Sequence, residues 1–153
     1  MAQPLEHGPR PEANLGYLFR LAHQRFRNLL EEALQATELT TQEYVVLSVF
    51  ETRPELSTSE LARITQVTRQ TMHVAVLGLE TGGLLERRPK NERVVLLRPT
   101  RRGFKILEAA TKRVRAVERA ALAGLSRDDE QTVRTWLASV AAMTTSTRQT
   151  SVK

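Results

Sequence analysis

The stretch from Ser57 to Thr100 carries local signals that admit few folds. Ser57 and Glu60 have the spacing of a capping box, in which each side chain accepts a hydrogen bond from the other residue's backbone N–H. This box predicts a short helix over Thr58–Thr65, and after a turn a second helix is predicted over Thr68–Thr81 with Thr68 as its N-cap. The buried face of the second helix is expected to contain Met72, Ala75, Val76 and Leu79, which recur at helical spacing.

A β-hairpin is predicted directly after these two helices. Gly82 and Gly83 end the second helix. Leu84–Arg88 and Arg93–Arg98 are rich in Leu and Val, and they flank the turn Pro89-Lys90-Asn91-Glu92. Two short helices followed by a hairpin form a winged helix-turn-helix, which is an architecture that reads DNA.

Further helices are predicted on both sides of this region. Apolar residues at helical spacing predict a long helix over 14–34, and a second capping box, Thr40 with Glu43, starts a helix that we expect to reach about Thr52. After the hairpin, Thr100 caps a helix to about Ala123, and Ser126 opens a last one. The predicted fold class is therefore mainly α with a small β-hairpin wing (α+β).

This pattern predicts dimerisation helices at residues 14–36 and 101–144 around a winged helix-turn-helix region at 37–100, with flexible tails at 1–13 and 145–153. The helix after the hairpin has apolar residues that step by three and four, as in a coiled coil. These are Leu107, Ala110, Val114, Val117 and Ala121. A chain of this length has little surface to cover such seams, so we expect a homodimer. The alternative is a monomer that folds its own termini together.

The distribution of charge favours nucleic acid as a partner. The chain has 153 residues and a formal net charge of +6. Residues 86–105 include eight basic and two acidic residues. The net charge of this stretch is therefore +6, the same as the net charge of the whole chain. Its place on the hairpin and the next helix start is where phosphates would lie. The simpler alternative for such a run is a solvated face.

Composition argues against several other classes. The chain has no cysteine and only three scattered histidines, so we expect no metal site and no cofactor. Neither a glycine-rich phosphate loop nor a His-Glu-x-x-His motif occurs, and no spacing singles out a catalytic triad, so an enzyme is not expected. No apolar run reaches the roughly 18 residues of a membrane span, and a cytoplasmic protein is the expectation.

Several motifs resemble those of the MarR-type regulators, the multiple-antibiotic-resistance repressors. Leu39, Thr40 and Gln42 are similar, with a small shift, to the family's Leu-Thr-x-x-Gln helix, and Glu60-Leu61-Ala62 resembles its Glu-Leu-Ala. Leu79-Glu80-x-x-Gly83-Leu84-Leu85-x-Arg87 and Thr100-x-x-Gly103 resemble the segments on either side of the family's wing. The resemblance covers roughly 14–143. It implies a winged helix-turn-helix dimer that binds double-stranded DNA and acts as a repressor.

Three departures from the family pattern affect the expected sequence preference. Asn91-Glu92-Arg93 stands where the family usually has Asp-x-Arg, and the hairpin is about two residues short. Pro99 replaces the usual Leu before Thr100, and Val74 occupies a recognition-helix position where arginine is common.

Base readout is expected from the recognition helix 68–81 in the major groove. The side-chain amide of Gln70 has the groups for a bidentate contact to adenine, and the side chain of Val74 can contact a thymine methyl. These two contacts favour an A·T-rich half-site. The resemblance implies that the wing, 87–98, enters the minor groove through Arg93, and we expect Arg93→Ala to weaken operator binding by about 1–3 kcal/mol. The full set of expected DNA-binding residues is Ser57, Thr68, Arg69, Gln70, Thr71, His73, Val74, Arg88, Lys90 and Arg93.

Alternatives to these roles remain. Gln70, Thr71 and His73 are also compatible with ordinary solvated surface, and Arg93 with a pair to Glu92. A winged helix used only for protein–protein contacts, without sequence-specific DNA binding, is the alternative function. Such a module would not need the charge concentrated on its wing.

A small aromatic or anionic effector is a further expectation, because members of the family often bind such molecules between the dimer helices and the winged lobe. Tyr17, Arg20 and His23 lie on the first helix, where Arg20 and His23 are i, i+3 neighbours with the chemistry to hold a carboxylate or phenolate. The alternative is an interface histidine beside an arginine in a surface ion pair.

Overall fold

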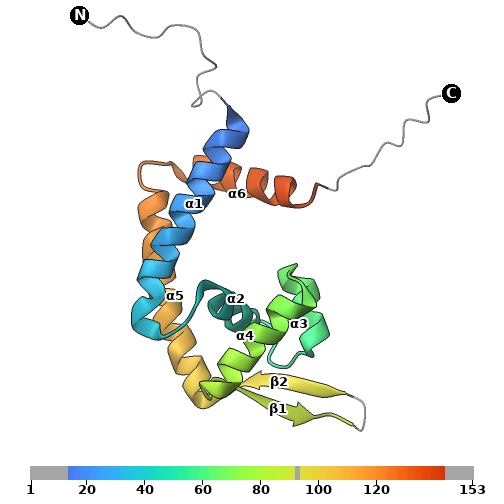
Figure 1. Ribbon diagram of the computed structural model, residues 1–153. Coiled ribbons are helices and arrows are strands. Elements are labelled where there is room, and N and C mark those ends of the chain that lie inside the picture. The colour runs from blue at the N-terminus through green and yellow to red at the C-terminus, as the bar shows by residue number, and fades with distance from the viewer. Residues whose placement is uncertain (1–13, 92–93, 144–153) are drawn as a thin grey trace, which may run out of the picture. The chain divides into compact units, whose positions relative to one another are not determined.

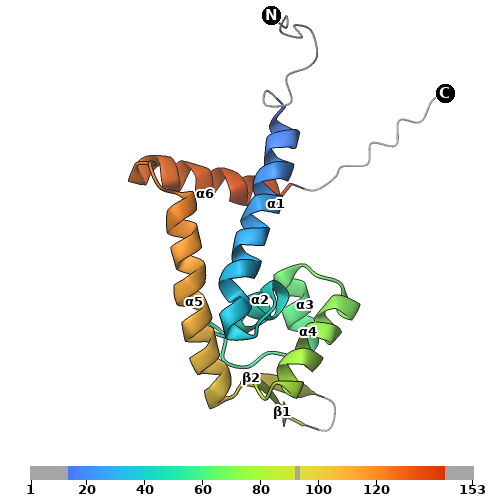
Figure 2. The same cartoon turned by 60° about the vertical axis from the view of Figure 1, so that its left-hand side comes forward.

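The computed structural model describes residues 14–91 and 94–143, and the expected tails and Arg93 lie outside them. Helices dominate, and one antiparallel hairpin projects from them (Figures 1 and 2). This confirms the predicted fold class. In chain order the elements are α1 (Leu15–Leu34), η2 (Gln35–Thr37, a 3₁₀ turn), α2 (Thr41–Val49), α3 (Thr58–Thr65), α4 (Arg69–Thr81), β1 (Leu85–Pro89), β2 (Val95–Pro99), α5 (Arg101–Ala121) and α6 (Arg127–Ala141).

The predicted helix starts are confirmed in their capping atoms. The Thr40 hydroxyl accepts from the Glu43 N–H at 3.2 Å, and the Glu43 carboxylate accepts from the Thr40 N–H at 2.9 Å. The same reciprocal pair forms between Ser57 and Glu60, at the start of α3. A third box joins Ser126 to Asp129 at the start of α6. A capping box therefore marks the first turn of three helices, α2, α3 and α6.

Two boundaries differ from the sequence prediction. α2 ends at Val49 rather than near Thr52, because the next N–H groups bond three residues back, from Glu51 to Ser48 and from Thr52 to Val49. Such tight bonds commonly close a helix end. The second wing strand begins at Val95, two residues after Arg93.

The hairpin pairs β1 with β2 antiparallel, from Leu85 opposite Pro99 to Pro89 opposite Val95. Leu56 adds a short antiparallel bridge to this sheet. Its N–H donates to the Leu97 carbonyl at 3.2 Å, and its carbonyl accepts from the Leu97 N–H at 2.8 Å. The bridge fixes the entrance to α3 against the base of the wing.

One apolar core holds the helix-turn-helix together. The predicted buried face of α4 is confirmed, since Met72, Ala75, Val76 and Leu79 are all buried. They pack in one cluster with buried residues of α1 to α3, the wing and α5. The largest fully buried side chains are Leu34, Val46, Leu47, Leu61, Met72, Val76, Leu79 and Leu97.

The chain divides into two compact units after Glu118. The seam predicted on α5 is corrected in the first unit, because Leu107, Ala110 and Val114 are already buried in the chain's own core. The start of α1 does leave an apolar surface uncovered, with Leu15 64% exposed and Leu18 and Phe19 also exposed. In the second unit, Trp136, Leu137 and Met143 are exposed.

Candidate DNA-binding surface

α4 has two faces of opposite character. Its N-cap is Thr68, whose hydroxyl accepts from the Thr71 N–H at 3.1 Å. One face is fixed in the core, and the other presents large apolar groups to solvent, with Val74 65% and Leu77 53% exposed. The remaining exposed side chains predicted to contact DNA on this helix are Arg69, Gln70, Thr71 and His73.

Ser57 serves first as a structural cap. Its side chain accepts from the Glu60 N–H and donates to the Glu60 carboxylate at 2.7 Å. The backbone N–H and then the hydroxyl of Ser57 lower the pKa of Glu60, because both hydrogen bonds favour the carboxylate form. Ser57 is half-buried, so the structure leaves it less available to a ligand than the exposed residues of α4.

The wing is joined to α4 by an ion pair. Arg87 donates two hydrogen bonds to the carboxylate of Glu80, from Nε at 2.6 Å and from Nη2 at 3.0 Å. Arg88 and Lys90 are both exposed, and Arg88 also reaches Glu86 at 3.2 Å. Arg93 lies outside the described residues. Of the predicted wing cations, two are therefore placed at the surface.

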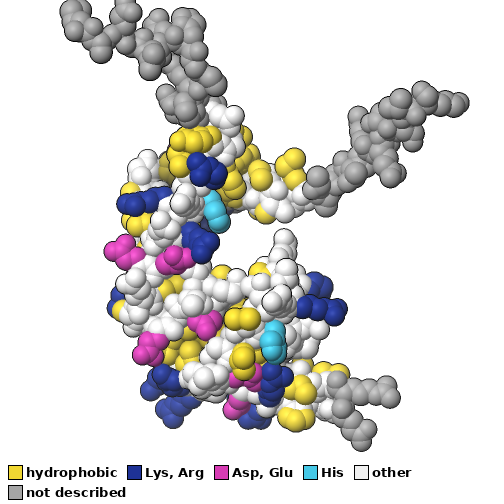
Figure 3. Space-filling view, in the orientation of Figure 1, with side chains coloured by type: hydrophobic (Ala, Val, Ile, Leu, Met, Phe, Trp, Pro, Cys, Tyr) yellow, Lys and Arg dark blue, Asp and Glu magenta, His cyan; other side chains and the backbone are white. Residues whose placement is uncertain are grey.

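The predicted DNA-binding residues fall on three elements rather than in one cluster. Those on α4 share one exposed side, Arg88 and Lys90 belong to the hairpin, and Ser57 belongs to the start of α3. Figure 3 shows Lys and Arg side chains spread over this face, with carboxylates between several of them. The basic side chains are therefore spaced apart rather than clustered, an arrangement compatible with each one contacting a different phosphate of a DNA backbone.

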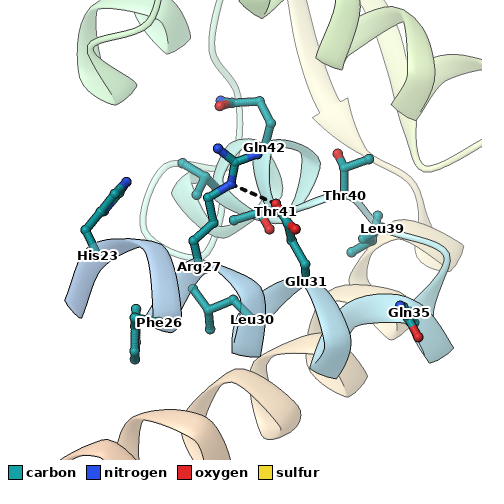
Figure 4. A pocket seen from close by; sticks show the side chains of 11 residues that line it. His23, Phe26, Arg27, Leu30, Glu31, Gln35, Leu39, Thr40, Thr41 and Gln42 are labelled. Carbon is teal, nitrogen blue, oxygen red and sulfur yellow. Dashed lines mark hydrogen bonds and ion pairs between the residues drawn. The ribbon is translucent and has the colours of Figure 1, made fainter. Parts of the chain in front are cut away.

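A cavity of about 720 Å³ lies between α1 and the start of α2 (Figure 4). It has the size of a small-molecule site. Arg27 and Glu31 form an ion pair at 2.8 Å on its α1 side. Two buried polar atoms among its lining residues, Thr41 Oγ1 and Gln42 Nε2, have no hydrogen-bond partner in the described part of the chain.

Only one of the three residues predicted to bind an effector lines this cavity. His23 lines the cavity, whereas Tyr17 and Arg20 are not among its lining residues. Instead, the Arg20 guanidinium lies over the Tyr17 ring, 5.4 Å from its centroid. Sequence reasoning missed Arg27, Glu31 and Gln42. The i, i+4 spacing of Arg27 and Glu31 was a visible signal, but it indicates an ion pair on any helix surface.

Within residues 14–91 and 94–143, no group of three or more His, Cys, Asp or Glu side chains is placed to hold a metal ion. None of the described helices combines the length and apolarity needed to cross a bilayer.

Comparison with known proteins identifies the family to which this chain belongs. The MarR family model matches residues 37–93, which contain α2 to β1. The HTH-type transcriptional repressor Rv2887 of Mycobacterium tuberculosis is 32% identical over 126 residues, covering 81% of this chain and 91% of that protein. The chain belongs to the MarR family.

Two solved structures of this family's type carry DNA. The Mycobacterium tuberculosis MarR family protein Rv2887, in complex with DNA, is 30% identical, has a TM-score of 0.69, and covers 84% of this chain and 98% of its own. The transcriptional repressor CouR, bound to a 23-mer duplex, is 26% identical with a TM-score of 0.78, covering 85% and 94%. Both similarities extend well beyond the winged region.

Val74 is exposed on the outer side of α4, at the position where the resemblance to MarR-type regulators led us to expect an arginine. An apolar side chain at this position offers no hydrogen bond to a base edge, and the group on DNA that it has the chemistry to contact is the thymine methyl.

Proposed function

We propose that this MarR family protein is a homodimeric, DNA-binding transcriptional repressor of the cytoplasm. The observation that carries the proposal is the two-faced recognition helix α4. Four core residues hold it in place, and its other side presents side chains of the kinds that read bases. The DNA-bound structures of Rv2887 and CouR support the assignment by similarity.

α4 enters the major groove, whose width admits one helix. Gln70 pairs with an adenine edge, Val74 contacts a thymine methyl, and Arg69 at the start of the helix contacts phosphate. Arg88 and Lys90 bind the backbone from the wing, and Arg93 enters the minor groove. The role of Arg93 rests on the family resemblance.

The exposed apolar start of α1 supports the dimer. In a single chain Leu15, Leu18 and Phe19 keep 64%, 44% and 43% of their surface in water, and burying the remainder is worth about 0.6–2 kcal/mol for each. A two-fold dimer presents two copies of α4, so its operator is a pseudo-palindrome with half-sites about one helical turn apart. Occupying such a site over a promoter excludes RNA polymerase, which gives repression.

The cavity between α1 and α2 supports release of DNA by a small aromatic or anionic effector. His23 and Arg27 line it with groups able to bind an anion, and Thr41 and Gln42 supply unpaired polar atoms. Phe26, Leu30 and Leu39 supply apolar lining. An effector changes DNA affinity only if it binds one arrangement of the two recognition helices more tightly than the other.

The test is fluorescence anisotropy with DNA from upstream of the protein's own gene and a scrambled duplex, across a salt series. Tighter binding to the native sequence, with a steep salt dependence, supports a specific regulator. Equal and weak binding to both duplexes contradicts sequence-specific repression. Absence of binding at low salt favours the alternative, a winged helix used for protein contacts.

A further inference from the structure

The C-terminal end of α4 is held by Thr100 and the first turn of α5. Three successive carbonyls after α4 accept hydrogen bonds from this segment. The Arg102 guanidinium donates to Gly82, the Thr100 hydroxyl donates to Gly83 at 2.7 Å, and the Thr100 N–H donates to Leu84 at 3.0 Å. The end of the recognition helix is therefore joined to α5 by side-chain and backbone contacts together.

Gly103 brings the two segments this close. A Cβ atom at residue 103 would overlap the carbonyl oxygen of Leu84, so only glycine permits the contact. The Gly103 N–H in turn donates to the Thr100 hydroxyl at 3.0 Å, which orients that hydroxyl toward α4. Arg102 lies between Thr100 and Gly103 in the sequence, so the contacts of these two residues hold its backbone close to the C-terminal end of α4.

Arg102 supplies a charge that α4 lacks. The last turn of α4 contains no basic residue, although the carbonyl end of a helix favours a positive charge. The guanidinium of Arg102 occupies this place from α5. A second guanidinium nitrogen, Nη2, lies 3.6 Å from Glu38, which follows η2 in the left-handed conformation at φ 59°. One side chain thus connects α4, α5 and the link between α1 and α2.

We infer that Arg102 is a positioning residue for operator recognition, which sets the direction of α4 without touching DNA. The inference rests on the proposed DNA-binding function. α4 has 13 residues and is about 20 Å long, so a tilt of roughly 5° at its C-terminal end moves the opposite end by almost 2 Å. Base contacts at Gln70 and Val74 depend on that end, whereas phosphate contacts tolerate the movement better.

Arg102→Ala and Arg101→Ala form a matched pair of variants. Each loses one positive charge at the start of α5, but the Arg101 side chain makes no hydrogen bond or ion pair with another described residue. Operator and scrambled duplex are titrated with both variants across a salt series, well below the melting temperature of each. We expect both to bind scrambled DNA equally, and Arg102→Ala to bind the operator about fivefold more weakly than Arg101→Ala. Arg102→Lys restores binding, because its ammonium can still donate to the Gly82 carbonyl.

Three results overturn the inference. The first is equal operator affinity for the two alanine variants. The second is weaker binding of Arg102→Ala to both duplexes with a salt slope reduced by about one, which marks a direct phosphate contact. The third is a lower melting temperature for Arg102→Ala with unchanged operator affinity, which marks stability alone. If Arg102→Ala does not fold, Arg102→Gln and Arg101→Gln take the same test. Failure of the wild type to prefer the operator contradicts the proposed function instead.

Discussion

The guanidinium of Arg87 and the carboxylate of Glu80 form a two-bond ion pair that ties the first wing strand to the recognition helix. The hydrogen bonds are 2.6 and 3.0 Å long, and Glu80 is the more buried partner, its side chain 20% exposed. The bond to Glu80 raises the pKa of Arg87 because it favours the charged guanidinium. The ion pair thus fixes the orientation of the wing relative to α4, the two elements that are proposed to enter different grooves of DNA.

Replacing Arg87 with alanine is expected to lower the free energy of unfolding by about 1 kcal/mol, a value that allows for solvent screening of the half-exposed guanidinium. Urea denaturation measures this loss. Arg88→Ala is the control, because its pair with Glu86 is a single, more exposed contact and should cost less than about 0.5 kcal/mol. Equal losses in the two variants would contradict a linking role for Arg87.

Gly103→Ala is expected to destabilise the protein by about 2–3 kcal/mol, because the added Cβ meets the rigid backbone oxygen of Leu84. Within a helix, the same change normally stabilises by up to about 1 kcal/mol. Thermal and urea unfolding of the variant measure the net effect. A stability at or above that of the wild type would show that α5 separates from Leu84 at little cost.

Gly78→Ala is the matched comparison for Gly103→Ala. There the new Cβ would overlap the carboxylate of Glu43, the far end of a side chain that is able to move. The helix gains intrinsic stability while the Thr40–Glu43 cap is disturbed, so the net change should lie within about 1 kcal/mol of zero. Both glycines lie within helices, but Gly103 is buried against a backbone oxygen, whereas Gly78 is exposed and faces the end of a side chain.

The fold was predictable from the sequence wherever a residue contacts residues that are close to it in the sequence. The two predicted capping boxes, Ser126 at the start of the last helix and the buried face of α4 are all short-range patterns, and they placed these helix starts correctly. The first three residues of the α5 seam were misjudged, because the spacing is the same whether a helix packs on another chain or on this chain's own core. Only the three-dimensional contacts of Leu107, Ala110 and Val114 separate these two cases.

The functional surface was predictable only in part. Exposed α4 residues follow from the helix period once the buried face is known, so Gln70 and Val74 were placed correctly on the outer side. The cavity was not predictable, because Arg27 and Gln42 lie on different helices and meet only after folding. Likewise, the contacts of Arg102 span 64 residues of sequence to Glu38 and 20 to Gly82, and no local pattern records them.

Stability at acid pH should depend on the Ser57–Glu60 box. Hydrogen bonds from Ser57 hold the pKa of Glu60 below its usual value of 4.5. A lowered carboxylate pKa contributes stability above the unfolded value, and the contribution is lost as pH falls through the folded pKa. Wild type should therefore exceed Glu60→Gln in urea midpoint at pH 7, with the difference shrinking below about pH 4.5. A difference that stays constant with pH would show that the charge of Glu60 contributes nothing.

Methyl readout by Val74 is tested by changing both partners of the contact. Val74 is 65% exposed and alanine is the better helix former, so Val74→Ala should not lower the melting temperature, while it weakens operator binding by about 1 kcal/mol. Replacing thymine with uracil removes only the C5 methyl that the side chain would touch. Wild type should therefore lose affinity when one particular thymine of each half-site becomes uracil, and Val74→Ala should be indifferent to that same change. Anisotropy with a set of singly substituted operators measures both. If every uracil substitution affects the two proteins alike, Val74 reads no methyl group, and specificity then lies with Gln70, the wing or the shape of the DNA.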